Sequence, residues 1–145
     1  MDLSDTSVDD YLGGIGDPQV AETMAALDAL LSEAMPGRRR ALYEGTFWGG
    51  TEQTIIGYGH IVQHRPKGEA VHWFLVGLAR QKTHYSLYVN AVTDGKYLGQ
   101  HYAERIGKVK LGSASIGFRR LDDLDIDILT ELLVRADEMT DPDPE

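Results

Sequence analysis

The five histidines are the first residues to consider, because imidazole binds metals and transfers protons near neutral pH. They are His60, His64, His72, His84 and His101. In a regular strand His60 and His64 share a face but stand roughly 13 Å apart, too far to bind one ion together. Pairing across a sheet with His72 or His84 is the alternative. We expect isolated polar strand residues and no histidine metal site.

Acidic residues gather at two places where oxygen ligands could hold a hard cation. These residues are Asp9 and Asp10 near the start, and Asp122, Asp123, Asp125 and Asp127 before the last predicted helix. Aspartate in a first helical turn also caps the helix and interacts favourably with its dipole. We therefore favour capping and solvated charges, and we expect neither a bound metal nor a cofactor.

Signatures of catalysis are weak. Ser86 lies two residues after His84 in a predicted strand, with no acid nearby in the sequence to orient the histidine. The spacing Gly107 to Gly112 resembles the start of a phosphate loop, but a serine and an alanine follow where that loop has Lys and Ser or Thr. The chain is therefore expected to be non-enzymatic, with a small enzyme using a His/Tyr site as a further alternative.

Charge divides the chain into three parts. The net charge is −9, yet residues 38–120 hold 13 of the 14 Lys and Arg and only five acids, so this middle part carries +8 and the flanks −17. The run Arg38, Arg39 and Arg40 follows the first long predicted helix, where cations complement the helix dipole. An overall negative charge gives a phosphate backbone no reason to bind, so we expect no nucleic acid partner.

These residues need a scaffold, and the periodicity of apolar residues predicts one. Asp17 and Pro18 open a helix over 18–35, and Asp125 caps a second that runs to Met139. Between them the period changes to two. The expected strands are 41–47, 54–63, 71–80, 85–92 and 113–119, with a helical turn at 8–12 and a short irregular helix at 96–106.

The predicted architecture is α+β, an antiparallel sheet of about five strands with N- and C-terminal helices packed on one face. One domain is expected over 8–139, between a flexible N-terminus at 1–7 and a disordered acidic tail at 140–145. The chain has no cysteine, no apolar run that could span a bilayer and no signal-like start. We expect a cytoplasmic protein without a membrane partner.

One hairpin suggests a ligand site. If Arg80 and Thr83 flank a two-residue turn, the strands 71–80 and 85–92 present a pure core face and a second, mixed face. The core face carries Phe74, Val76, Leu78, Tyr85, Leu87 and Val89. The mixed face carries Trp73, His84, Tyr88 and Asn90, together with Leu75, Gly77, Ala79 and Ser86.

Four stretches of the chain have a distinctive order and spacing: GTEQTIIGYG at 50–59, WFLVGLARQK at 73–82, HYSLYVNAV at 84–92 and GKVKLGSASIGFRRLDDLD at 107–125. They resemble the YdhG-like family, a domain of unknown function (number 1801) grouped with the YjbR/CyaY-like superfamily. The resemblance runs from about Val8 to Ala136 and implies an antiparallel sheet flanked by terminal helices. Many relatives carry Gly-Lys-Ser where this chain has Gly112, Ser113 and Ala114, so a role for that lysine does not transfer.

The resemblance implies no established activity, although some relatives are labelled intracellular iron chaperones. An iron or metal chaperone that uses the acidic clusters is therefore the alternative function. Our leading expectation is non-enzymatic binding of a small anionic or aromatic ligand, or of a protein partner, by a monomer or homodimer. Trp73 and Tyr88 would stack on the ligand, and His84 and Asn90 would orient it.

Overall fold

The computed structural model of the chain describes residues 2–46, 52–63 and 68–144. Within these ranges the α-helices are α1 (Val8–Gly13), α2 (Pro18–Ala34) and α3 (Ile126–Glu138), with 3₁₀ turns η2 (Leu98–Tyr102) and η3 (Leu121–Asp123). The strands are β1 (Asp2–Leu3), β2 (Arg40–Thr46), β3 (Glu52–Tyr58), β4 (Ile61–Gln63), β5 (Val71–Trp73), β6 (Val76–Arg80), β7 (Tyr85–Val89), β8 (Val92–Thr93), β9 (Lys96–Tyr97), β10 (Lys110–Leu111) and β11 (Ser115–Phe118).

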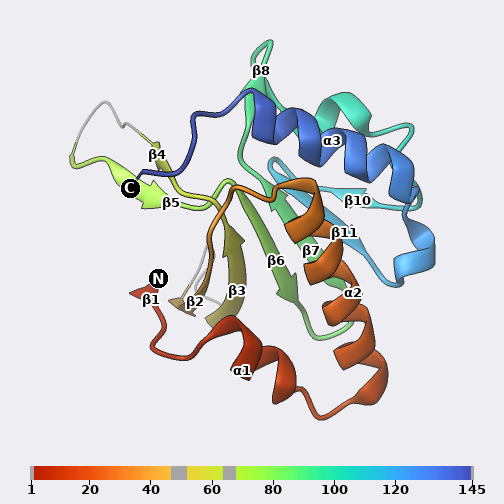
Figure 1. The fold of residues 1–145 in the computed structure, drawn as a ribbon. Helices are drawn as coiled ribbons and strands as arrows, with labels where there is room; N and C mark the ends of the chain where they lie inside the picture. Colours follow the sequence, from red (N-terminus) through yellow and green to blue (C-terminus); the bar gives the residue numbers. More distant parts are fainter. Residues whose placement is uncertain (1, 47–51, 64–67, 145) are drawn as a thin grey trace.

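The main sheet has seven strands in the order β1-β2-β3-β6-β7-β11-β10, and every neighbouring pair is antiparallel. Helices α2 and α3 lie against each other on one face of it (Figure 1). We call the opposite face the outer face. The predicted α+β class, with long helices on one side of an antiparallel sheet, is confirmed, although the sheet has more strands than the expected five.

The two long helices begin where the sequence places them. The Asp17 carboxylate accepts hydrogen bonds from the N–H groups of Gln19 and Val20, and Pro18 occupies the first turn. The Asp125 carboxylate likewise accepts from the N–H of Ile128. Both helices bury an apolar stripe, and the residues buried are Met24, Leu27 and Leu31 in α2 and Leu129, Leu132, Leu133 and Ala136 in α3.

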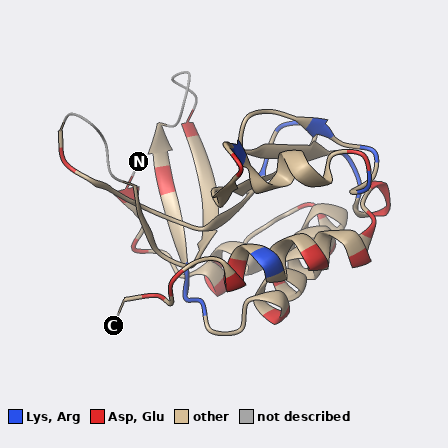
Figure 2. Ribbon diagram, turned by 90° about the horizontal axis from the view of Figure 1, so that it is seen from above, with Lys and Arg blue, Asp and Glu red and all other residues tan. Residues whose placement is uncertain are grey.

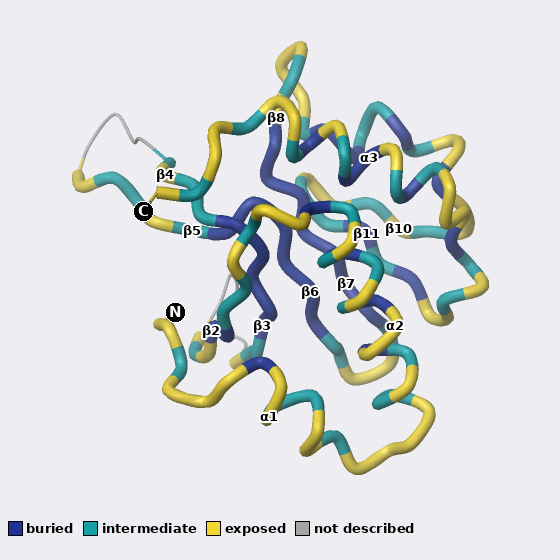
Figure 3. Tube along the Cα trace, viewed as in Figure 1, coloured by how far each residue is buried: buried dark blue, intermediate teal, exposed yellow. Residues whose placement is uncertain are grey.

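The main apolar core lies between these helices and the inner face of the sheet. Strands β6 and β7 are buried along almost their whole length, as the dark segments of Figure 3 show. Inward-facing residues of neighbouring strands are directly paired, as in Ile56 with Leu78 and Leu78 with Leu87. The centre of the sheet is therefore buried on both of its faces.

Two expected strands divide into two parts. The expected strand 54–63 breaks at Gly59, and the expected strand 71–80 breaks at Phe74 and Leu75. Gly59 has φ +80, a conformation that residues with a Cβ rarely adopt. The second part of the first strand, β4, and the first part of the second strand, β5, leave the main sheet and pair with each other as a separate hairpin.

Other expected strands change at their ends. The strand expected at 85–92 ends at Val89, and the segment expected to be an irregular helix at 96–106 begins as β9 before entering η2. The strand expected at 113–119 is β11, which pairs with β10, a strand that was not expected. Phe47, the last residue of the strand expected at 41–47, lies outside the described residues.

A second apolar cluster lies on the outer face and corrects the expected position of Phe74. The cluster consists of Tyr43, Ile55, Phe74, Ala79 and Tyr88. Because the chain bends at Leu75, strand alternation is interrupted, so Leu75 joins the main core and Phe74 turns outward. A Cβ at Gly77 would lie only 2.5 Å from Cε1 of Phe74, so this glycine makes room for the ring.

Both ends of the described chain contact the domain, while a flexible N-terminus and a disordered tail stay predictions. Near the N-terminus, β1 pairs with β2. In the acidic tail, the Asp143 carboxylate accepts hydrogen bonds from Arg38 and from the N–H groups of Arg39 and His60. The tail thus lies against the start of β2, because Arg38 provides a partner that sequence distance conceals. Among the described residues, no helix has both the length and the apolar character needed to cross a bilayer.

Candidate functional site

The outer face of β7, β11 and β10 is lined by small and polar residues rather than apolar ones. Pairing aligns Lys110 with Gly117 and Gly117 with Ser86, which gives a row across three strands. The neighbouring row pairs Ser115 with Tyr88. Isoleucine and leucine side chains of the same strands point to the main core, so alternation itself directs these polar residues outward.

A cavity of about 760 Å³ lies over this part of the sheet and is called here the first cavity. It is lined by Thr83, His84, Ser86, Lys108, Val109, Lys110, Leu111, Gly112, Ser115, Gly117, Phe118, Arg119 and Asp123. Gly117 leaves space in its floor, because a Cβ there would be 3.5 Å from the Lys110 carbonyl oxygen and 3.6 Å from Cδ2 of His84. Its volume lies within the roughly 300–1,000 Å³ typical of small-molecule sites.

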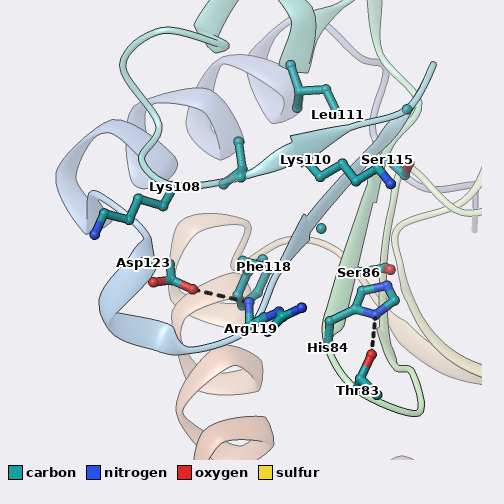
Figure 4. Close-up of a pocket in the computed structure, with 13 residues that line it drawn as sticks. Thr83, His84, Ser86, Lys108, Lys110, Leu111, Ser115, Phe118, Arg119 and Asp123 are labelled. Carbon is teal, nitrogen blue, oxygen red and sulfur yellow. Dashed lines mark hydrogen bonds between the residues drawn. The ribbon is translucent and has the colours of Figure 1, made fainter.

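The polar side chains around the first cavity come from three segments (Figure 4). Lys110, on β10, extends toward Ser115. Arg119, just after β11, extends toward His84, which ends the turn between β6 and β7. The Lys108 side chain points away from Lys110 and Arg119. Nitrogen donors from three segments therefore line the first cavity together with Gly117.

The first cavity is electropositive. Lys108, Lys110 and Arg119 line it together with one acid, Asp123. The Asp123 carboxylate accepts hydrogen bonds from the N–H groups of Arg119 and Arg120, so it fixes the turn into η3. Across residues 2–46, 52–63 and 68–144, the three cations form no ion pair within 4.0 Å.

Figure 2 shows several Lys and Arg positions on the side of the molecule away from the C-terminus, with others near the C-terminus and on a helix, while Asp and Glu occur on the helices and also on strands. A cavity with several unneutralised cations and hydroxyl donors can bind a small anion through charge-assisted hydrogen bonds.

A second cavity, of about 410 Å³, adjoins the first on the outer face. It is lined by Gln63, Trp73, Tyr88, Asn90, Tyr97, Ser113, Ala114 and Ser115. Ser115 lines both cavities. The second cavity has aromatic and uncharged polar walls, in contrast to the basic first cavity.

Three of the four expected ligand residues, Trp73, Tyr88 and Asn90, line the second cavity, and His84 lines the first. The turn between β6 and β7 lies one residue later in the chain than the sequence predicts. Gln81 and His84 flank it, so Ala79 pairs with Ser86 rather than with His84. Moving a turn by one residue shifts each partner by two, and a shift of two preserves which face a side chain occupies.

The environments of Tyr88 and Asn90 differ from the open surface that was expected. Tyr88 is 7% exposed and Asn90 8%. The Asn90 amide donates to the Phe74 carbonyl oxygen at 2.9 Å, so it holds the bent segment before β6. The Tyr88 hydroxyl accepts from the Gln81 amide at 3.2 Å, and burial outweighs its hydrogen bonds to raise the pKa of Tyr88.

Trp73 is half-buried and packs on the outer-face cluster rather than on the helices. Its ring stacks on Phe74 at a centroid distance of 4.4 Å and lies 5.6 Å from that of Tyr43. These ring contacts hold the indole in place, and Trp73 also lines the second cavity.

Sequence reasoning missed the cationic residues Lys108, Lys110 and Arg119 and the aromatic Tyr97. The signal for β10 was present in residues 108–111, where lysines alternate with Val109 and Leu111 in the period of a strand. A strand of two residues is too short for that alternation to stand out. No local pattern places Tyr97 beside Trp73, because tertiary folding alone brings them together.

Three residues of the two acidic clusters, Asp9, Asp123 and Asp125, have structural partners. Asp9 lies 2.7 Å from Arg40, and Asp123 and Asp125 accept hydrogen bonds from backbone N–H groups. His60 and His72 face each other, with 2.9 Å between Nε2 and Nδ1, while His64 lies outside the described residues. In the described part of the chain, no group of three or more His, Asp or Glu is arranged to hold a metal ion.

No family model, curated protein or solved structure matches this chain.

Proposed function

We propose that this chain is a binding domain that takes a small anionic ligand on the outer face of its sheet, in the first cavity. The carrying observation is that Lys110, Arg119 and His84, from three different segments, line one cavity together with Gly117. This proposal makes the earlier expectation of a small anionic or aromatic ligand more specific and moves its centre from Trp73 to the basic residues.

Physical chemistry supports an anion rather than a cation or a neutral molecule. Lys110 and Arg119 have no carboxylate within ion-pair distance among the described residues, so their charge is available to a ligand. Ser86 and Ser115 add hydroxyl groups to the same cavity. Charge-assisted hydrogen bonds contribute about 1.5–3 kcal/mol each, so two of them account for a measurable affinity.

The test is isothermal titration of the protein with inorganic phosphate and with pyrophosphate at low ionic strength. We expect saturable binding that weakens as salt is added, because the cavity cations are solvent-exposed. Lys110→Gln and Arg119→Gln should each weaken binding about tenfold, which corresponds to about 1.4 kcal/mol.

Lys96→Gln is the matched control, since Lys96 is an exposed lysine that lines neither cavity. It should leave the affinity unchanged. Absence of saturable binding to either anion would overturn the proposal, as would equal effects of Lys96→Gln and Lys110→Gln.

Membership of the YdhG-like family stays a prediction, as do cytoplasmic location and a monomeric or homodimeric state. The antiparallel sheet with long helices on one face is the architecture which that resemblance implies. Light scattering of the purified chain measures the oligomeric state directly.

A further inference from the structure

We infer that the two adjoining cavities form one bipartite site for a phosphate that carries an aromatic ring, with nucleotides as the chemical class. The phosphate would lie in the first cavity and the ring in the second. This inference rests on the proposed anion site and adds the identity of the group attached to the anion.

The first argument is continuity. Ser115 lines both cavities, so a ligand in one can extend into the other past this residue. Lys110 is paired with Gly117, two residues along β11 from Ser115, and Ser115 is paired with Tyr88. At the rise of a strand, two residues span roughly 7 Å. A pentose is a linker of suitable size between a phosphate and a base at that separation.

The second argument is the chemistry of the walls. Trp73, on β5, and Tyr97, on β9, bring aromatic rings to the second cavity from different segments. Aromatic rings stack on nucleobases with about 1–3 kcal/mol per base, whatever the base. Gln63 and Ser113 add amide and hydroxyl groups that can bind the edge of a base.

The third argument is that the dividing wall is held in place. The turn between β10 and β11 separates the cavities, and the Gln100 amide donates to the carbonyl oxygens of Gly112 and Ser113 at 2.6 and 3.1 Å. The Ala114 carbonyl oxygen accepts from the N–H of Val89 at 3.0 Å. A fixed turn reduces the ordering cost when a ligand contacts both sides.

The experiment compares four ribonucleoside monophosphates (AMP, GMP, CMP and UMP) with ribose 5-phosphate and inorganic phosphate by isothermal titration. We expect at least one nucleotide to bind ten times or more tightly than ribose 5-phosphate. The same nucleotide should quench tryptophan fluorescence, and Trp73→Phe should remove most of that quenching.

The separating variant is Ala114→Leu, which adds bulk to the second cavity and removes no contact. It should reduce the advantage of the nucleotide over ribose 5-phosphate to about onefold while inorganic phosphate binds as before. Lys110→Gln should weaken all phosphorylated probes alike. Ala103→Leu, at a half-buried alanine that lines neither cavity, is the control.

The outcomes separate the two proposals. If ribose 5-phosphate or inorganic phosphate binds through Lys110 but no nucleotide binds more tightly, the anion site stands and the bipartite inference is wrong. If no phosphorylated probe binds at all, both fail. A nucleotide preference that survives Ala114→Leu would also overturn the inference, because the ring would then lie elsewhere.

Discussion

Replacing Arg38 by methionine tests how the C-terminal tail is attached to the domain. The Arg38 side chain is only 4% exposed, and its guanidinium donates to the carboxylates of Asp137 and Asp143 at 2.7 and 3.1 Å. It also donates to the carbonyl oxygens of Asp137, Thr140 and Asp141. One side chain therefore joins the start of β2 to the end of α3 and to the tail.

The expected cost follows from what the substitution leaves behind. Removing one partner of a buried ion pair costs about 3–5 kcal/mol when the other charge stays buried. Asp137 is partly exposed and Asp143 can move into water with the tail, so water replaces part of the lost interaction. We therefore expect Arg38→Met to reduce the free energy of unfolding by about 2–3 kcal/mol.

Urea denaturation followed by circular dichroism measures this change. Arg39→Met is the matched control, because the Arg39 side chain is 67% exposed and its contribution should lie within about 0.5 kcal/mol of zero. Asp143→Asn alone should cost about 1–2 kcal/mol. The double variant Arg38→Met/Asp143→Asn should cost clearly less than the sum of the single changes, since both remove the same contact.

The reasoning would be refuted by an Arg38→Met cost as small as that of Arg39→Met, or by additive effects in the double variant. Acid gives an independent check. Burial raises the pKa of Asp143, but hydrogen bonds from the N–H groups of Arg39 and His60 and from Arg38 outweigh it, so its pKa lies below the ordinary value. The tail contact should thus be complete above about pH 4 and be lost as the pH falls through the lowered pKa.

Two further changes test the packing on either face of the sheet. Gly77→Ala should reduce the free energy of unfolding by about 1–3 kcal/mol in urea, because its Cβ would lie 2.5 Å from Phe74, whereas Gly117→Ala, with contacts of 3.5 Å or more, should cost less. Tyr58→Phe should cost about 1.5–3 kcal/mol, since the Tyr58 hydroxyl donates to Asp28 at 2.6 Å. Burial and this bond raise the pKa of Tyr58, so above about pH 10 the native protein should lose stability with pH more steeply than Tyr58→Phe, and a parallel decline would contradict this account.

Helix positions and fold class could be predicted from the sequence because both are encoded locally. Asp17 and Pro18 provide the capping group and backbone angle of the first turn, and the spacing of Met24, Leu27 and Leu31 sets the buried stripe. The face of each residue in β7 followed from alternation alone. An error of one residue in the turn did no harm to that assignment, because it shifted the pairing by two.

Local patterns could not predict the interruptions of the sheet. Ile55 points to the outer-face cluster and Ile56 to the main core, so both parities of that strand are apolar and its open face was undefined in the sequence. Phe74 turns outward where Gly77 leaves room for its ring and Gly57, on the paired strand, leaves room for its Cβ. Such a space is formed by residues of two paired strands, so no single stretch of the sequence predicts it.

The candidate site, like the sheet, was only partly predictable from the sequence. The sequence by itself determined that His84 and Tyr88 share a face, since that requires only alternation along residues 84–88, whereas Trp73 lies on β5, beyond the bend that interrupts the alternation. It did not determine that Lys110 and Arg119 stand beside them, because the order of strands decides which residues meet across a sheet. Tertiary structure placed β11 and β10 next to β7, and that placement alone converts a diffuse excess of positive charge into a basic cavity beside an aromatic one.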